Sequence, residues 1–153
     1  GAAAPAPRPA VAPDARGAKA LLSVEPDLGT LGAEELRRVK DLTVSREGVG
    51  LITFPGETDC TGLDVERVVR LEVGEVLVYP EGGAKPAVGQ GLNRPAVVTM
   101  LQCFPPNESK LLQDPQAQER YKRKIRQMTE EKQATFLDYD CATGVWKFGV
   151  DHF

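Results

Sequence analysis

The sequence predicts an α+β domain in which a mostly antiparallel β-sheet, arranged as a sandwich or a half-open barrel, is flanked by helices. Short segments rich in β-branched and aromatic residues alternate with turn signals along most of the chain. Helical periodicity is confined to a few segments, which places the helices around the sheet. The 153 residues suit one domain. That length can form a core without disulfides or metals.

Residues 1–22 are predicted to form a disordered Ala/Pro-rich linker, and the folded domain is predicted to span residues 23–153. The linker places four prolines among alanines, at Pro5, Pro7, Pro9 and Pro13. Each proline removes a backbone donor, so together they disfavour both helix and central strand. The segment also offers little apolar surface to bury.

The first elements of the folded domain are predicted to be a short helix and two strands. Residues 34–40 (EELRRVK) have helical spacing, with two apolar residues facing inward. The period then changes to alternation on both sides of a turn at residues 46–50. The second strand, Leu51–Phe54, is expected to stop at the turn pair Pro55-Gly56.

The middle of the chain is predicted to contain one helical turn and two more strands. Thr61 and Asp64 have the hydroxyl–carboxylate spacing of a helix start. Residues 71–79 (LEVGEVLVY) are strand-like, with Gly74 as a possible bulge, and residues 80–83 form a turn. Residues 95–104 (PAVVTMLQCF) are the next strand.

The last third is predicted to be a long helix followed by a hairpin. Asp114 is a good N-cap and Pro115 a good first residue for a helix over 115–133. Its apolar stripe consists of Tyr121, Ile125 and Met128. Residues 134–140 and 145–153 then read as two strands joined by a turn.

Composition excludes several kinds of site. The net charge of −3, with both signs mixed, gives no strong attraction to nucleic acid or to an anionic membrane. No apolar run reaches the length of a membrane span. Three widely spaced cysteines argue against a disulfide framework, and one histidine nearly excludes a Cys/His zinc site. We therefore expect buried core cysteines in a reducing compartment, and neither a cofactor nor a metal.

The end of the chain places its only histidine, His152, near the core. Alternate residues of a strand share a face, so His152 would lie on the side of Trp146, Phe148 and Val150. A position at the rim of the core would favour the neutral imidazole, which accepts protons. The alternative is a histidine that closes a core edge with one hydrogen bond. A strand that stops at an aromatic residue suggests either a chosen chain boundary or a cut within the fold.

Four segments resemble, in order, the autoproteolytic C-terminal domain of the GLFG nucleoporin family. They are GVGLITFPG at 48–56, the helix turn and strand within 63–79, PAVGQGLNRPAVVT at 86–99, and TGVWKFGVDHF at 143–153. A single GxG pattern would be weak, but four motifs in the family's order are specific. The similarity runs from about residue 30 to Phe153, which is roughly four-fifths of the chain.

The resemblance implies cleavage of the peptide bond between the His-Phe pair and a following serine. Phe153 would then supply the attacked carbonyl, and His152 would be the catalytic histidine. The serine, which is absent from this chain, would be the nucleophile, so the chain is expected to be the cleaved form. The reaction is an N-to-O acyl shift followed by hydrolysis, performed once and in cis by a serine autopeptidase.

Two neighbouring residues of the GLNR motif, Asn93 and Arg94, are candidates to supply oxyanion donors or to position the cut. The alternative is that Asn93 shapes a turn and Arg94 is solvated. The residues alone favour the alternative.

The lasting function that the resemblance implies is docking at the nuclear pore complex, in the nucleus. Expected partners are the downstream segment released by cleavage and a β-propeller nucleoporin on the cytoplasmic side of the pore. Two alternatives are a protein–protein interaction module that does not cleave, and weak RNA binding through the basic helix face at residues 122–126. A solvated helix face explains that basic run better, so nucleic acid is the less favoured partner.

Overall fold

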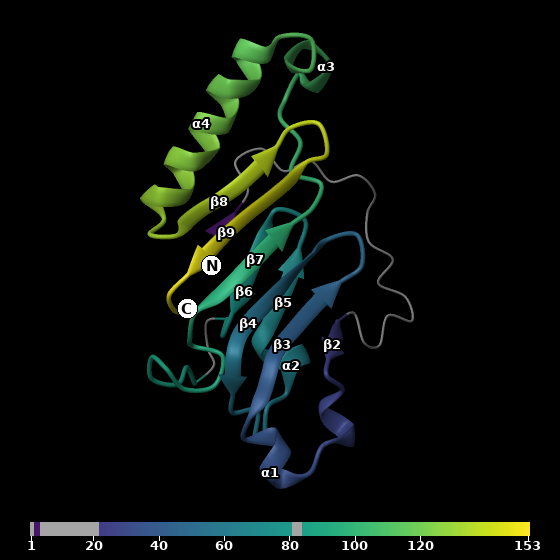
Figure 1. Ribbon diagram of the computed structural model, residues 1–153, viewed down its shortest axis with the longest axis vertical. Coiled ribbons are helices and arrows are strands. Elements are labelled where there is room, and N and C mark those ends of the chain that lie inside the picture. The colour runs from purple at the N-terminus through teal and green to yellow at the C-terminus, as the bar shows by residue number, and fades with distance from the viewer. Residues whose placement is uncertain (1, 4–21, 81–83) are drawn as a thin grey trace.

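The computed structural model describes residues 2–3, 22–80 and 84–153, and it confirms an α+β fold built on a six-stranded antiparallel sheet with flanking helices (Figure 1). Along this sheet the strand order is β2 (Ser23–Glu25), β3 (Val39–Arg46), β4 (Gly50–Thr58), β7 (Ala96–Met100), β9 (Val145–Val150) and β8 (Thr135–Asp140). A smaller sheet has the order β1 (Ala2–Ala3), β6 (Glu75–Val78) and β5 (Val69–Glu72).

The helices lie around the ends and one edge of the larger sheet. Their bounds are η1 (Leu28–Thr30), α1 (Ala33–Leu36), α2 (Val65–Val68), α3 (Glu108–Leu111) and α4 (Pro115–Glu131). Figure 1 shows α4 running beside the edge strand β8, with α1 at the opposite end of the molecule. None of the helices among the described residues is long and apolar enough to cross a membrane.

The core is organised by strand register. Val44, Ile52, Val98 and Phe148 lie side by side on four neighbouring strands and are all fully buried. The smaller sheet belongs to the same buried cluster through residues such as Val76. Since register fixes which face each side chain occupies, the row that ends at Phe148 also fixes the path of the last strand.

Helix α4 confirms the prediction for residues 115–133 almost to its ends. The Asp114 carboxylate caps it by accepting hydrogen bonds from the backbone N–H groups of Gln116 and Ala117, at 3.0 and 3.2 Å. Buried Thr129 connects the helix to the sheet, because its hydroxyl accepts a 3.1 Å hydrogen bond from Nε1 of Trp146. The same hydroxyl donates to the Ile125 carbonyl at 2.7 Å, so both polar functions of this buried group are satisfied.

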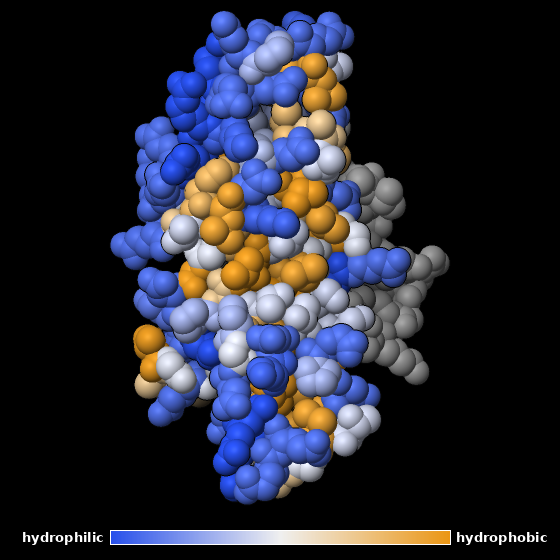
Figure 2. Space-filling model, viewed as in Figure 1, coloured by the Kyte–Doolittle hydropathy of each residue, from blue (hydrophilic) through white to orange (hydrophobic). Residues whose placement is uncertain are grey.

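The basic face of α4 is partly neutralised by acidic neighbours. Lys122 lies 3.4 Å from Asp138, and Arg126 lies 3.6 Å from Glu130 while also stacking over the Phe136 ring. Figure 2 shows that the outer surface along α4 is hydrophilic, whereas hydrophobic residues gather over the middle of the visible sheet face. This arrangement is typical of a solvated helix face.

The prediction of one strand over residues 71–79 is wrong. Strands β5 and β6 form a hairpin, in which Glu72 pairs with Glu75. Gly74 has a φ of 77° and lies in the two-residue turn instead of in a bulge. The apolar alternation continues on both sides of the turn, and for that reason the sequence resembles a single strand.

The prediction that Pro55-Gly56 ends its strand is also wrong, because β4 continues to Thr58. Proline offers no N–H to the neighbouring strand. The pairing shifts in β3 opposite this segment, where Asp41 takes a φ of 49°. The Asp41 carboxylate accepts a 2.8 Å hydrogen bond from the Gly56 N–H. Pro55 and Gly56 of β4 thus lie opposite the single residue Asp41 of β3, and this bulge in β4 accommodates the proline.

Other boundaries differ because local signals are weak in short elements. Helix α1 ends at Leu36, so the predicted helix over 34–40 is too long, and Val39 begins β3 as a buried residue. Helix α2 starts at Val65 and not at Thr61. The strand predicted over 95–104 ends at Met100, and β2 and α3 were not predicted.

The prediction of a disordered linker over residues 1–22 falls mostly outside the described residues. Within that range the structure describes β1, which pairs antiparallel with β6, and Leu22. Most of the predicted turn at 80–83 also lies outside the described residues.

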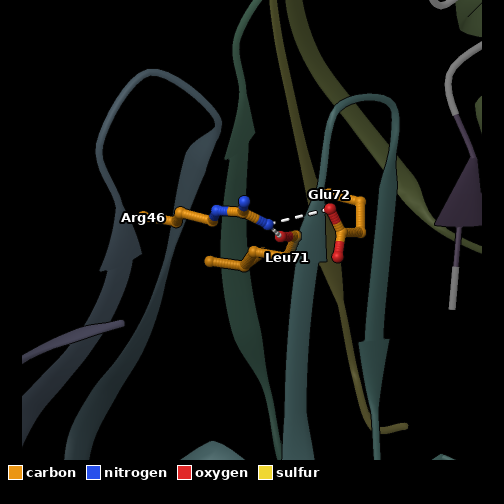
Figure 3. A network of polar contacts seen from close by, with 3 residues as sticks. All are labelled: Arg46, Leu71 and Glu72. Carbon is orange, nitrogen blue, oxygen red and sulfur yellow. Dashed lines mark hydrogen bonds and ion pairs between the residues drawn. The ribbon is translucent and has the colours of Figure 1, made fainter. Parts of the chain in front are cut away.

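Arg46 connects the two sheets (Figure 3). Its guanidinium group donates to the carbonyl oxygen of Leu71 and to the carboxylate of Glu72, each at 2.8 Å, and its side chain is only 14% exposed. The carbonyl of Leu71 belongs to β5, the free edge of the smaller sheet among the described strands. Arg46, from the larger sheet, thus supplies a hydrogen-bond donor to a backbone carbonyl at the edge of the smaller sheet.

We predict that Arg46→Ala lowers the free energy of unfolding by about 1–3 kcal/mol, because it leaves the Leu71 carbonyl without this charged donor. Urea unfolding would measure the loss. The matched control is Arg37→Ala, which removes a salt bridge to Glu34. In that salt bridge the Arg37 side chain is 60% exposed and the Glu34 side chain is 75% exposed. Such an exposed pair contributes only about 0–1 kcal/mol. Equal losses for the two variants would contradict this role for Arg46.

All three cysteines are buried and free. Burial is the main cause that raises the pKa of Cys60 to about 11 and that of Cys103 to about 12, and it also raises the pKa of Cys141. Thiolates react, whereas neutral thiols do not. These residues therefore fit the expectation of core cysteines.

We predict that the folded protein reacts at least about 100-fold more slowly with a thiol reagent at pH 8 than the urea-unfolded protein does. Because the folded thiols keep their protons to higher pH than unfolded ones, stability from the thiols is present at neutral pH and declines as pH rises above about 9. Spectrophotometric thiol titration in both states measures the rates. A cysteine that reacts equally fast in both states would refute the prediction.

Candidate functional site

The GLNR motif lies in a tightly bonded loop before β7. The Gly89 N–H donates to the Asn93 carbonyl at 2.6 Å, and the Asn93 N–H donates to the Gln90 carbonyl at 3.0 Å. The Tyr79 hydroxyl accepts a 2.9 Å hydrogen bond from the Leu92 N–H. Gly91 has a φ of +54°, and a Cβ there would lie 2.6 Å from that hydroxyl, so the loop requires glycine at this position.

Asn93 contacts the end of the chain directly. Its side-chain oxygen Oδ1 accepts a 2.7 Å hydrogen bond from the backbone N–H of Phe153, and its Nδ2 donates to the Pro86 carbonyl at 2.9 Å. Asn93 is only 2% exposed. The donor on one side and the acceptor on the other fix the orientation of the amide group. The side chain therefore connects its own loop to the residue whose carbonyl the resemblance implicates.

Phe153 is held at a second point, by its ring. The ring centroid lies 6.1 Å from that of Phe54 in a tilted arrangement, and Phe54 is fully buried in β4. The Phe153 side chain is partly buried and packs against the core cluster. The residue is thus fixed by its amide and by its side chain.

The expected position of His152 on the core face is wrong, because the structure places its side chain on the exposed surface. Pairing of β9 with β7 ends where Ala96 meets Val150, and the chain bends at Asp151. Beyond the last pair the strand alternation no longer applies. As a result, Phe153 packs inward and His152 does not.

His152 and Phe153 line a shared pocket of about 310 Å³ at the end of β9. Lys132 and Asp151 bring one charge of each sign to its wall. The remaining wall is mainly apolar or amide and consists of Val76, Gln133, Ala134, Phe148 and Val150. His152, Lys132 and Phe153 therefore line one partly apolar space.

Arg94 is half-buried, and its side chain forms a hydrogen bond with β4 instead of with Phe153. Its Nη1 donates to the hydroxyl of Thr58 at 2.9 Å, at the end of β4. Arg94 also lines a separate polar pocket of about 540 Å³ together with Gln90. The structure thus brings Asn93 into contact with Phe153, whereas the hydrogen bond described for Arg94 goes to β4.

Sequence reasoning missed two parts of the site. Phe54 is predicted as the end of a strand and as part of a matching motif, and that motif is the signal that could have identified it as a site residue. The segment Lys132–Ala134 follows α4 and carried no motif at all. Within the described residues, no group of three or more His, Cys, Asp or Glu side chains could hold a metal ion.

The arrangement is suited to acyl chemistry at the Phe153 carbonyl. A histidine next to an acyl carbon can accept a proton from an attacking hydroxyl. The buried amide contact and the ring contact restrain Phe153 at two points, and such restraint favours reaction when a nucleophile lies close by.

Residues 23–153 match the Nucleoporin2 family model, described as the Nup98-96 autopeptidase. The nuclear pore complex protein NUP98A of Arabidopsis thaliana is 42% identical over 137 residues, which is 84% of this chain and 13% of that protein. The chain therefore spans a small part of the length of this curated relative. Its relatives are nuclear pore complex nucleoporins.

Solved structures agree with the family match. A mutant of the Chaetomium thermophilum Nup145N APD fused to Nup145C N superposes with a TM-score of 0.74 at 30% identity, covering 86% of this chain and 94% of that chain. A chain of the yeast Nup82-Nup159-Nup116 complex gives 0.72 at 25% identity, covering 86% and 95%. The chain therefore belongs to the Nup98-96 autopeptidase family of nucleoporins.

Proposed function

We propose that this domain cleaves its own chain once, in cis, after Phe153, and then serves as a docking domain of a nucleoporin at the nuclear pore complex. The observation that carries the proposal is the double restraint on Phe153, by Asn93 and by Phe54, beside His152 in one pocket. Membership of an autopeptidase family supports it.

In the proposed reaction a serine that follows Phe153 supplies the nucleophile. Its hydroxyl oxygen attacks the Phe153 carbonyl carbon while His152 accepts the hydroxyl proton. The carbon–nitrogen bond then breaks, and the leaving amine takes up a proton, which produces an ester. Water hydrolyses the ester to the Phe153 carboxylate and the free serine hydroxyl. Because nucleophile and carbonyl belong to one chain, the reaction needs no separate substrate site.

The exposed position of His152 is compatible with this role. His152 lines the same pocket as Phe153 and adjoins it in the sequence. Arg94 has no part in this proposal, since its hydrogen bond goes to Thr58.

Docking is proposed to use the pocket at the end of β9. Its apolar residues, among them Val76, Val150 and Phe153, offer burial to a peptide, while Lys132 and His152 offer polar contacts. A downstream segment released by the cut would start at this position. One solved relative was fused to Nup145C N, and another was seen with Nup82 and Nup159. We propose a downstream segment and a pore partner of this kind as ligands.

We predict that a version of this chain with a serine-led extension yields a product ending at Phe153, and that His152→Ala slows the reaction about 100-fold or more, because a general base contributes about 10²–10⁴-fold. Intact mass spectrometry over time measures both rates. Arg123→Ala, on the exposed face of α4, is the control and should cleave like wild type.

Equal rates for wild type and His152→Ala would remove His152 from the mechanism. A folded wild-type extension that stays intact would refute self-cleavage and leave only the docking role.

We predict that deleting His152 and Phe153 weakens binding of a fluorescent peptide with the Nup145C N sequence of the Chaetomium fusion at least about tenfold, which corresponds to roughly 1.4 kcal/mol. Fluorescence anisotropy measures affinity, and thermal melting confirms that the deletion variant is folded. The control is Leu112→Asp, at an exposed residue that directly follows α3. Figure 1 shows α3 beside the start of α4, whereas the pocket residues 132–134 follow the end of α4. Undiminished binding by the deletion variant would contradict docking in this pocket.

A further inference from the structure

We propose that Asn93 is a positioning residue for the cut: it holds the reacting carbonyl carbon of Phe153 in place by binding the N–H of the same residue. This inference rests on the proposed self-cleavage after Phe153. It separates Asn93 from Arg94, its neighbour in the motif, whose hydrogen bond goes to Thr58.

The first support is the identity of the group that Asn93 contacts. Its Oδ1 accepts the N–H of Phe153 at 2.7 Å, across 60 positions of sequence. That N–H and the reacting carbonyl belong to one residue and are separated only by its α-carbon. With the N–H fixed by Asn93 and the ring fixed by Phe54, rotation about the Cα–C bond is the main backbone freedom left to the carbonyl.

The second support is that the Asn93 amide cannot turn freely. Its Nδ2 donates to the Pro86 carbonyl, so reversing the amide would place oxygen against oxygen and nitrogen against the Phe153 N–H. The side chain is 2% exposed, and water cannot easily replace either partner. The oxygen is therefore preset toward the reacting residue.

The third support is the rigidity of the loop behind Asn93. Backbone hydrogen bonds join Asn93 to Gly89 and Gln90, and the Tyr79 hydroxyl accepts a hydrogen bond from the preceding residue, Leu92. Leu92 is fully buried. A side chain on such a loop can hold a reacting group to a fraction of an ångström, and a misplacement of about 1 Å can cost about 100-fold in rate.

The test measures cleavage in the chain with a serine-led extension, by intact mass, for wild type, Asn93→Ala, Asn93→Asp and Thr129→Val. Thr129→Val is the matched control, because Thr129 is 1% exposed and also makes two side-chain hydrogen bonds, but to α4 and Trp146. All rates are measured at a temperature at which circular dichroism shows every variant to be folded. If Asn93→Ala is unfolded, Asn93→Ser, whose shorter side chain cannot span both partners, takes its place.

We expect Asn93→Ala to cleave about 100-fold more slowly than wild type, and Thr129→Val to cleave like wild type despite its lower melting temperature. Asn93→Asp distinguishes positioning from stability. It keeps an oxygen that accepts the Phe153 N–H, but it buries a carboxylate beside the Pro86 carbonyl, which lowers stability further. Positioning predicts that Asn93→Asp cleaves faster than Asn93→Ala although it melts at a lower temperature.

Rates that simply follow melting temperature, with Asn93→Asp slower than Asn93→Ala, would overturn the inference. So would an Asn93→Ala variant that cleaves as fast as Thr129→Val. In both cases cleavage by wild type would leave the proposed function standing. A folded wild type that does not cleave would overturn the proposed function and this inference with it.

Discussion

The hydrogen bond between the Phe153 N–H and the Asn93 side chain is the contact on which the candidate site depends. A backbone terminus beyond the last paired residue of a strand would ordinarily move freely. Here the buried amide of Asn93 holds it, and leaving that amide without its partner would cost about 1–3 kcal/mol. The Phe54 ring adds an apolar contact to the same residue. The end of the chain is therefore part of the folded core and not an appendage to it.

Strand register and loop geometry in the rest of the fold bring Phe153 and Asn93 together. The row of buried residues from β3 to β9 fixes the register of β9 and therefore the point at which its pairing with β7 ends. Beyond that point, the bend at Asp151 turns Phe153 inward. Gly91 permits the loop to pass the Tyr79 hydroxyl and thereby places Asn93 opposite Phe153. The proposed chemistry and the stability of the fold thus depend on the same buried groups. In the proposed reaction the nucleophile belongs to the same chain, so the fold has only to hold the Phe153 acyl carbon in place, which the two contacts do.

Much of the fold could be predicted from the sequence where signals are local. The cap at Asp114, the proline after it and the apolar stripe predicted α4. The local signals failed where pairing with a neighbouring strand decides the outcome. Strand β4 continues past Pro55 because Pro55 and Gly56 bulge opposite Asp41 of β3, and no pattern around Pro55 reveals that pairing. His152 was misplaced because alternation was extended past the last strand pair. The motif match drew attention to Asn93, but its contact joins residues 60 positions apart and exists only in the folded chain.

Amide hydrogen exchange of the chain followed by NMR tests the central contact most directly, because it reports on the Phe153 N–H itself. We expect this N–H to exchange much more slowly than those of Asp151 and His152, and Asn93→Ala to abolish its protection while α4 stays protected. A Phe153 amide that exchanges as fast as an unstructured terminus would show that Asn93 does not hold the residue where the proposed chemistry requires it.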